Sequence, residues 1–388
     1  MSEKKVTIPF HILLIIIPLV LVAYTLLKSP PAPMPSPSPL PPETKPPAIN
    51  LAELALPPDW SQLDRFQKTI TRKTFIDRLQ KIYTKNNTWQ NWIKIDHQNN
   101  LAEIGNYILH FSEVDHSPPG SIWNWKTRNS LTSSQELPLS GLHIVLDPGH
   151  IGGSFAEIEE REYQWDDTLI QEGTMTLETA KTLAPMLQDL GAKVTLVRTE
   201  LKPVTTHTAK DFADPRLFYR TSEIRARAQL INHTYQPDLV ICLHYNGSAS
   251  EIPENKQHFH IILNGTYTNN ELAHEDELFQ MLQRLLSGTI IEEIPLATAI
   301  ATTFNNNANL PPYRYSFASS TSQNIANHPN LWARNLLANR IYQCPVIFME
   351  PYVMNSQPFI TRYQKAPQEI YHEYALSVAQ GIASYYAQ

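Results

Sequence analysis

The stretch HIVLDPGHIGG, residues 143–153, joins a short apolar run to an Asp-Pro-Gly turn, and a histidine follows the turn at once. The run has the length and the β-branched content of a buried strand, and proline and glycine commonly end such a strand. A histidine in this position is either incidental to the turn or one member of a site whose other members lie elsewhere in the chain. His150 is therefore the first candidate functional residue.

From about residue 141 onward, segments typical of strands alternate with segments typical of helices. The predicted strands are HIVLD (143–147), AKVTLVR (192–198), DLVICLHYN (238–246) and CPVIFME (344–350). The predicted helices cover residues 174–191, 222–233, 277–288 and 369–388. This alternation predicts an α/β, phosphorylase/hydrolase-like fold, in which helices flank a mainly parallel or mixed sheet on both faces.

Three of the predicted strands lead to a polar residue that is capable of chemistry, namely His150, His244 and Glu350. Functional residues of open parallel sheets lie beyond the carboxyl ends of the strands, so these side chains are expected to converge. A catalytic zinc site needs three protein ligands and one open position for water. Two histidines and a carboxylate suit such a site, but spacing alone does not select the carboxylate. The candidates after the first histidine are Glu157, Glu159, Glu160, Glu162, Asp166, Asp167 and Glu172.

A family resemblance rests on four segments that occur in a fixed order along the chain. They are IVLDPGHIGG, EGTMTLETAKTLAPMLQDLGAKVTLVR, RAQLINHTYQPDLVICLHYN and CPVIFMEPYVMN. Together they resemble the zinc-dependent N-acetylmuramoyl-L-alanine amidase family of bacterial cell-wall hydrolases, over about residues 141–388. The resemblance implies that His150, Glu172 and His244 bind Zn²⁺ and that Glu350 is the catalytic residue.

The activity that the resemblance implies is hydrolysis of peptidoglycan at the amide between the lactyl group of N-acetylmuramic acid and L-alanine. Glu350 would act as general base and then general acid. Two alternatives stay open. One is a zinc peptidase or carboxypeptidase that acts on the cross-link peptides, and the other is an inactive membrane-tethered protein that binds peptidoglycan.

The chain departs from the family pattern in several places. Ile151 interrupts the usual Gly-Gly after the histidine, and the segment from His150 to Glu172 is longer than usual and acidic. Extra residues also lie between Arg198 and Arg227. These insertions are expected to line or cover the site. Whether one of them blocks the site until a regulatory protein binds is a question that the sequence leaves open. Arg227 matches an arginine of the family whose role is either structural or substrate-facing.

Residues 1–28 have the character of a membrane anchor. Twenty residues from Ile8 to Leu27 carry no formal charge apart from a possible one on His11, and as a helix they would span about 30 Å. Lys4 and Lys5 precede this run, which favours a cytoplasmic N-terminus. The sequence therefore predicts a single-pass protein of the bacterial inner membrane with an exported catalytic domain on the periplasmic or cell-wall side. A cleaved signal peptide is the alternative.

Between this anchor and the catalytic domain, 141–388, the sequence predicts a linker and a small module. Residues 29–50 carry proline at nearly every second position, which favours an extended polyproline linker. Residues 51–140 are expected to form an α+β accessory module of unknown role, with a helix over 71–84. Its tryptophans either belong to a core or form a sugar-stacking surface, and they are Trp60, Trp89, Trp92, Trp123 and Trp125.

The composition limits the classes of function. The 388 residues are 42% hydrophobic and 18% charged, as in ordinary folded proteins, and the formal net charge is −6. A chain of this charge has no basic field for nucleic acid, so nucleic-acid binding is not expected. Cys242 and Cys344 are the only cysteines. They form neither a disulfide framework nor a CxxC metal site, and we expect them to be small buried residues, with a single bridge as the alternative.

Overall fold

A computed structural model describes residues 57–116, 123–131, 136–249, 253–316 and 319–387 of the chain. The predicted anchor (1–28) and proline-rich linker (29–50) therefore lie outside the described residues. Among the described residues, no single helix is long and apolar enough to cross a membrane. Two consecutive helices joined at a bend of 74°, Glu275–Ser287 and Thr289–Ala308, meet the length and composition criteria only when they are taken together.

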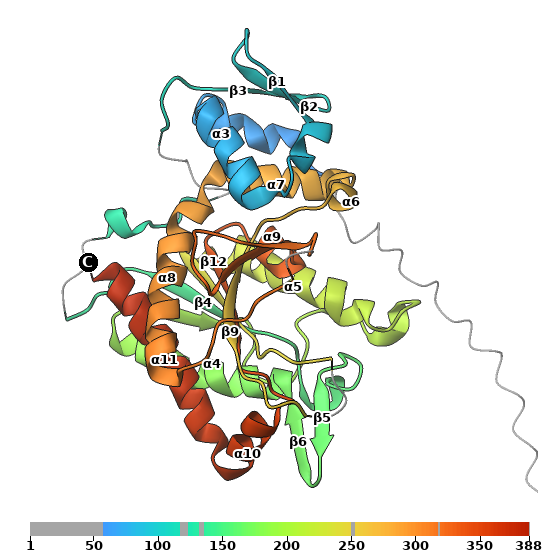
Figure 1. Cartoon of the computed structure of the whole chain (residues 1–388), viewed down its shortest axis with the longest axis vertical. Coiled ribbons are helices and arrows are strands. Elements are labelled where there is room, and N and C mark those ends of the chain that lie inside the picture. Colours follow the sequence, from blue (N-terminus) through green and yellow to red (C-terminus); the bar gives the residue numbers. More distant parts are fainter. Residues whose placement is uncertain (1–56, 117–122, 132–135, 250–252, 317–318, 388) are drawn as a thin grey trace, which may run out of the picture. The chain divides into compact units, whose positions relative to one another are not determined.

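A seven-stranded mixed sheet forms the centre of the larger part of the chain (Figure 1). Its strands, in spatial order, are β10 (Ser322–Asn324), β11 (Leu331–Arg334), β9 (Phe259–Leu263), β12 (Val346–Pro351), β8 (Leu239–Leu243), β4 (His143–Pro148) and β7 (Lys193–Leu196). The neighbours β12, β8, β4 and β7 run parallel. The pairs β12–β9 and β10–β11 are antiparallel. The predicted mixed α/β sheet is confirmed.

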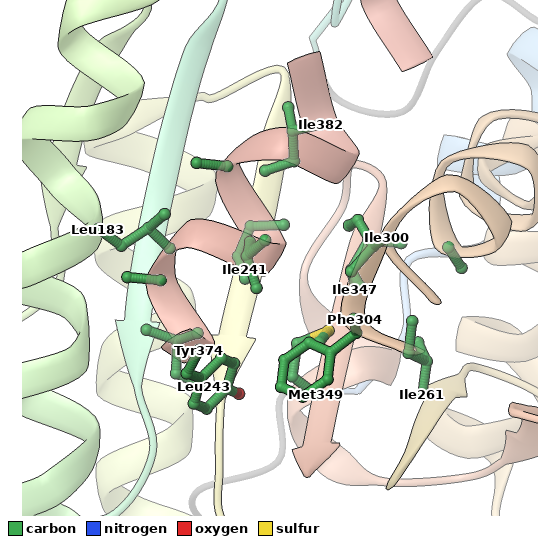
Figure 2. Close-up of a cluster of buried hydrophobic side chains, with 14 of the residues drawn as sticks. Leu183, Ile241, Leu243, Ile261, Ile300, Phe304, Ile347, Met349, Tyr374 and Ile382 are labelled. Carbon is green, nitrogen blue, oxygen red and sulfur yellow. The ribbon is translucent and has the colours of Figure 1, made fainter. Parts of the chain in front are cut away.

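Successive residues of the strands point into different cores. In β4, Ile144 and Leu146 join one apolar cluster, whereas Val145 joins another. The first cluster lies under α4 (Glu172–Asp189), α8 (Thr289–Ala308) and α11 (Pro367–Tyr386), and Figure 2 shows part of it. The second lies under α5 (Ile224–Gln229), η8 (Leu230–Tyr235) and α9 (Leu337–Ile341). Both faces of the sheet are therefore covered by helices, as the continuous apolar runs predict.

Both cysteines belong to the interior of this sheet region. Cys242 lies in β8 and Cys344 lies two residues before β12, and each is buried and free. The prediction that they are small buried residues is confirmed, and the alternative of a single disulfide bridge is wrong.

A separate three-stranded antiparallel sheet forms within the predicted accessory module. Its strands are β1 (Ile93–Asp96), β2 (Leu101–Ile104) and β3 (Tyr107–His110). They pack with η1 (Trp60–Phe66), α3 (Arg72–Arg78), η2 (Leu79–Tyr83) and η3 (Thr88–Asn91). The helix expected over 71–84 is therefore present as α3 followed directly by η2.

The core of this small sheet is shared with helices that come much later in the chain. Residues of α6 (Asn269–Leu272) and α7 (Glu275–Ser287) complete the apolar cluster that contains Phe75 and Trp89. Residues 123–131 lie elsewhere, since Trp123 packs against the cluster under α5 and α9 and its Nε1 donates to the carbonyl of Pro237. The domain boundary near residue 140 stays a prediction.

The accessory module contacts the large sheet, through η2, at the amino ends of the parallel strands. Strand β9 begins beside the carboxyl end of β12, because His260 pairs with Glu350. It therefore ends at the opposite edge, where the backbone of Thr266 and Tyr267 donates to the carbonyls of Ile82 and Tyr83. The contact with the accessory module and the carboxyl edge of β4, β8 and β12 thus lie at opposite ends of the strands.

Candidate active site

The four residues singled out at strand and helix ends come together at the carboxyl edge of the large sheet. His150 follows β4, His244 follows β8, and Glu350 is near the end of β12. Strand β8 lies between β4 and β12, so the three strand ends are neighbours. Glu172 is the first residue of α4. One nitrogen from each histidine and one oxygen of Glu172 all lie within 4.8 Å of one another.

The two imidazoles hold the same carboxylate. His150 Nε2 is 3.1 Å from Glu172 Oε2, and His244 Nδ1 is 3.0 Å from Glu172 Oε1. The two rings stand nearly perpendicular, at 81°, with their centres 5.2 Å apart. Two ligands of a tetrahedral zinc, each ~2.0–2.1 Å from the metal, are about 3.3 Å from one another. The spacing and the nitrogen, nitrogen and oxygen donors therefore fit a zinc ion.

Burial and mutual charge set the protonation states of this cluster. Burial lowers the pKa of His150 well below its usual value. Burial alone would raise the pKa of Glu172, but the two histidines lower it overall. A neutral imidazole and an ionised carboxylate are the forms that bind a metal. The cluster is therefore biased toward its ligand state.

Glu350 lies beside the cluster in a different environment. Burial raises its pKa to about 7, while His244 opposes the rise and Glu172 adds to it. A carboxyl group with a pKa near neutrality can both accept and return a proton at the working pH of a cell. The ligand candidate Glu172 and the catalytic candidate Glu350 thus have pKa values shifted in opposite directions, which is the usual sign of an assigned acid–base role.

A cleft of about 510 Å³ opens over these residues. Its wall is built from strand ends and from the inserted segments together. The lining includes Asp147, His150, Arg161, Tyr163, Glu172, Tyr219, His244, Asn246, Ser248, Arg334, Phe348 and Glu350. The expectation that insertions line the site is confirmed for the segments that carry Arg161 and Tyr219.

Arg227 fixes the turn that carries His150. Its side chain is only 2% exposed and pairs with Asp147 and Glu223. Its guanidinium also donates to the backbone carbonyls of Pro148 and His150. His150 needs this support because its φ of 57° lies in the left-handed region, which is strained for a residue other than glycine. Of the two roles left open for Arg227, the structural one is supported.

Ile151 anchors an insertion. Its side chain is fully buried and packs with Phe212, Phe218 and Tyr219, which belong to the segment between Arg198 and Arg227. Tyr219 in turn stacks on the His150 ring at 4.5 Å and accepts a hydrogen bond from its backbone N–H. The residue that interrupts the usual Gly-Gly therefore connects the inserted segment to a candidate metal ligand.

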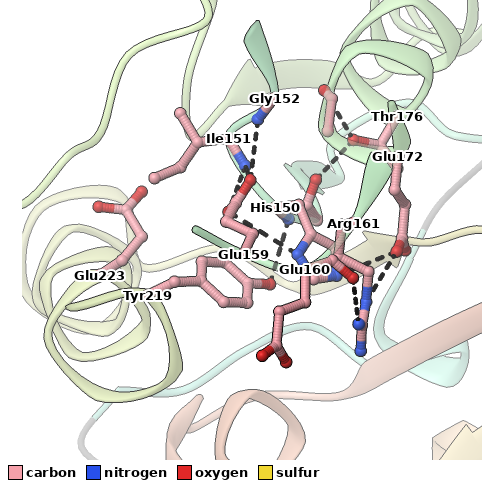
Figure 3. A network of polar contacts seen from close by, with 12 residues as sticks. His150, Ile151, Gly152, Glu159, Glu160, Arg161, Glu172, Thr176, Tyr219 and Glu223 are labelled. Carbon is pink, nitrogen blue, oxygen red and sulfur yellow. Dashed lines mark hydrogen bonds and ion pairs between the residues drawn. The ribbon is translucent and has the colours of Figure 1, made fainter. Parts of the chain in front are cut away.

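The acidic segment after His150 folds into η5 (Gly153–Phe155) and a hairpin of β5 (Glu162–Trp165) and β6 (Thr168–Gln171). Of its seven candidate carboxylates, Glu172 alone belongs to the described three-residue cluster. Glu159 has a different task, because it accepts hydrogen bonds from the backbone N–H groups of Ile151 and Gly152 (Figure 3). Its Oε1 lies 3.7 Å from His150 Nδ1, behind the ring.

Several supporting residues carry no signal in the sequence. Arg161 Nε lies 3.3 Å from Glu172 Oε2, and the Phe348 ring stacks on the His244 ring at 4.3 Å. Tyr374 donates to the backbone carbonyl of His244. Gly149 is an exception, because the Asp-Pro-Gly turn marks it in the sequence. The structure adds a reason for glycine there, since a Cβ would lie 2.3 Å from the His244 ring. The other contacts join segments far apart in the chain, so spacing could not reveal them.

Comparisons with known proteins identify a matching family model and several similar proteins. The family model described as N-acetylmuramoyl-L-alanine amidase matches residues 144–383. The germination-specific N-acetylmuramoyl-L-alanine amidase of Bacillus subtilis (strain 168) is 30% identical over 150 residues, which are 38% of this chain and 56% of that protein. The probable cell wall amidase LytH of Staphylococcus aureus is 31% identical over 110 residues, which are 28% of this chain and 36% of that protein.

The chain thus spans about half, or less, of the length of these curated relatives. Among solved structures, the N-acetylmuramyl-L-alanine amidase Ami1 from Mycobacterium smegmatis aligns with a TM-score of 0.42 and 20% identity. The alignment covers 64% of this chain and 98% of that structure.

Proposed function

Since the chain belongs to the N-acetylmuramoyl-L-alanine amidase family over residues 144–383, we propose that it is a peptidoglycan hydrolase. The bond cleaved is the amide between the lactyl group of N-acetylmuramic acid and the L-alanine of the stem peptide. The observation that carries the proposal is the placement of Glu350 beside the cluster of His150, Glu172 and His244 at the floor of one cleft.

The proposed cofactor is Zn²⁺, held by His150, Glu172 and His244. When bound, zinc polarises the scissile carbonyl and lowers the pKa of water. The chain holds the two histidines in a fixed orientation. Arg227 donates to the carbonyl of His150, and Tyr219 stacks on the His150 ring. Phe348 stacks on the His244 ring, so the nitrogens of both histidines keep the orientation that a metal needs.

Glu350 is proposed to move the proton. Its carboxylate takes a proton from the attacking water as the oxygen adds to the amide carbon, and it then passes that proton to the departing nitrogen of L-alanine. The products are a free lactyl carboxylate on the glycan and a stem peptide with a free amino terminus. The raised pKa of Glu350, about 7, suits both halves of this transfer.

The two alternatives receive less support. A protein that only binds peptidoglycan has no need of a carboxyl group such as Glu350, with its raised pKa, inside the cleft. A zinc peptidase would use the same ligand chemistry, so the family match over 144–383 is what favours the muramoyl amide. Product analysis separates these functions, because an amidase alone releases intact stem peptides that begin with L-alanine.

The proposal also covers location. Residues 1–28 would anchor the protein in the inner membrane, and 29–50 would extend the rest toward the cell wall. The apolar run from Ile8 to Leu27 supports this, as does the dense proline content after it. A protein lacking 1–28 should leave the membrane fraction on cell fractionation, and its retention there would contradict the anchor.

The decisive experiment treats purified peptidoglycan with the protein and identifies the soluble products by mass spectrometry. Intact stem peptides with a free L-alanine amino terminus are expected, together with their loss on adding a chelator and their return on adding Zn²⁺. Shorter peptides cut within the cross-link would instead establish a peptidase. If the peptidoglycan is unchanged although Zn²⁺ is present, the alternative of an inactive protein that only binds peptidoglycan would be favoured.

A further inference from the structure

A second hollow, of about 630 Å³, lies on the accessory module, where the β2–β3 hairpin and η3 meet the beginning of α7. We propose that it binds an uncharged, N-acetylated sugar chain. We call it the aromatic pocket and define it by Trp60, Trp92, Tyr107, Asn91, Asn106 and Glu275. None of these residues belongs to the cleft that carries Glu350.

Three aromatic rings contribute to the pocket's apolar surface, together with aliphatic side chains such as Ile104 and Leu272. Trp60 stacks on Tyr107, with ring centres 5.7 Å apart and planes 30° apart. Trp60, Trp92 and Tyr107 are each half-buried, pack against the module's apolar cluster and line the hollow with their remaining exposed surface. A sugar ring presents a flat face of C–H groups, and such a face packs well on an indole or phenol ring.

The two indoles are held in place by polar contacts from distant parts of the chain. Trp60 Nε1 donates to Glu275 Oε1 at 2.8 Å, and Trp92 Nε1 donates to Asn269 Oδ1 at 3.1 Å. A surface fixed in this way loses little freedom when a ligand binds, which favours affinity. Trp89, by contrast, is only 4% exposed and belongs to the module's core. The core role expected for the tryptophans is confirmed for Trp89. The sugar-stacking role of Trp60 and Trp92 is part of the proposal.

The polar groups of the aromatic pocket select an uncharged ligand. Asn91 and Asn106 are exposed at its rim, and an amide both donates to and accepts from hydroxyl and acetamido groups. Glu275 adds an acceptor. Among the described residues that line the pocket there is no lysine, arginine or histidine. A phosphate or carboxylate ligand would therefore find no cation, whereas a neutral sugar finds both stacking rings and hydrogen-bonding partners.

The position of the pocket suggests what binding achieves. The accessory module contacts the large sheet through η2, at the strand ends opposite the cleft, so a sugar bound in the aromatic pocket is not the one being cleaved. Such a site would hold the protein on its polymer and raise the local concentration of cleavable bonds. The preference for N-acetylated amino sugars over other neutral sugars rests on the proposed function. The expectation that the pocket binds a neutral sugar rests on its lining residues instead.

The test titrates the full chain with the β-1,4-linked tetrasaccharide of N-acetylglucosamine by isothermal calorimetry. Saturable binding is expected, and Trp92→Ala should weaken it about tenfold, by ~1.4 kcal/mol. Asn106→Ala should weaken it about threefold, and since that side chain is exposed the variant should fold normally. Ile108→Ala is the matched control, since this 47% exposed residue lies on the same sheet outside the pocket and should leave the affinity unchanged.

Absence of saturation up to ~10 mM tetrasaccharide, or equal affinity in wild type and both pocket variants, would overturn the inference. Cleavage of a small soluble muramoyl peptide is measured on the same proteins. Cleavage without sugar binding would refute sugar binding at the aromatic pocket and leave the proposed amidase function standing. Sugar binding without cleavage would refute the amidase function and leave the pocket's role standing, so the two failures are distinguishable.

Discussion

The carboxyl edge of the large sheet and the accessory module are built by opposite means. At the sheet edge, buried charged groups satisfy one another: Arg227 bridges Asp147 and Glu223, and Glu172 is held by two histidines. The accessory module has an apolar core instead, shared with α7, and ion pairs of the module lie at exposed or half-exposed positions, as in Lys73–Asp77 and Lys94–Glu103. The first arrangement suits chemistry, because buried charges hold groups at fixed positions and shift their pKa values. The second suits binding.

The sharpest test of this contrast removes a candidate ligand. His150→Ala should abolish Zn²⁺ binding and lower amidase turnover at least ~1,000-fold, because one of three protein ligands is lost. Metal analysis of the purified protein and stem-peptide release measure the two effects. His143→Ala is the control, since this histidine begins the same strand and contacts Thr195 rather than the cluster. Stoichiometric zinc in His150→Ala would refute the assignment.

Glu350→Gln should keep the zinc and lose the chemistry. Without a carboxylate to move the proton, turnover should fall about 10²- to 10⁴-fold. The amide has the same shape, so metal content and melting temperature should match the wild type. A rate within tenfold of wild type would show that another group carries the proton.

Arg227→Met tests whether the buried network is the mount for His150. Removing the cation leaves Asp147 and Glu223 buried without their partner, and we expect a loss of ~3–5 kcal/mol in the free energy of unfolding. Displacement of His150 should also lower turnover up to ~100-fold. Arg225→Met is the matched control, because this arginine lies on the same helix, is half-buried and pairs with Asp276 at 3.9 Å rather than with Asp147 or Glu223. Equal effects of both substitutions would contradict the mounting role.

The pH profile of kcat/KM gives a smaller effect. Glu350, with its pKa raised to about 7 by burial, accepts a proton only when ionised. The rate should therefore fall about tenfold for each pH unit below ~7, and this acid limb should be missing from the residual rate of Glu350→Gln. An acid limb near pH ~4.5, the pKa range of an ordinary glutamate, would show that the proton is carried by a carboxylate without the raised pKa of Glu350.

The sequence predicts the carboxyl edge of the large sheet better than it predicts the accessory module, and the reason is physical. His150, His244 and Glu350 follow apolar strand runs, and a parallel sheet brings strand ends together, so local pattern predicts their convergence. Glu172 needed the family resemblance, because its spacing does not distinguish it from six other carboxylates. Tyr219 and Arg161 were missed, and Glu159 was considered only as a metal ligand, since their contacts depend on how the insertions fold back. The module's shared core with α7 joins residues about 200 positions apart, and no local pattern reports that.

The smallest expected effect on turnover tests whether the two regions are independent. Phe75→Ala removes a fully buried ring from the module's core and should cost ~3–5 kcal/mol there, seen as faster hydrogen exchange in β1–β3. Cleavage of a soluble muramoyl peptide should stay within about twofold, because the cleft lies at the opposite strand ends.

One path argues against full independence. Arg284 of α7 donates to the carbonyls of Tyr342 and Cys344 and pairs with Glu293, just ahead of β12, the strand that carries Glu350. A loosened α7 therefore has a direct route to the catalytic strand. If Phe75→Ala lowers kcat on the soluble substrate tenfold while the zinc content is unchanged, the comparison fails. The module is then a structural support of β12 as well as a binding surface.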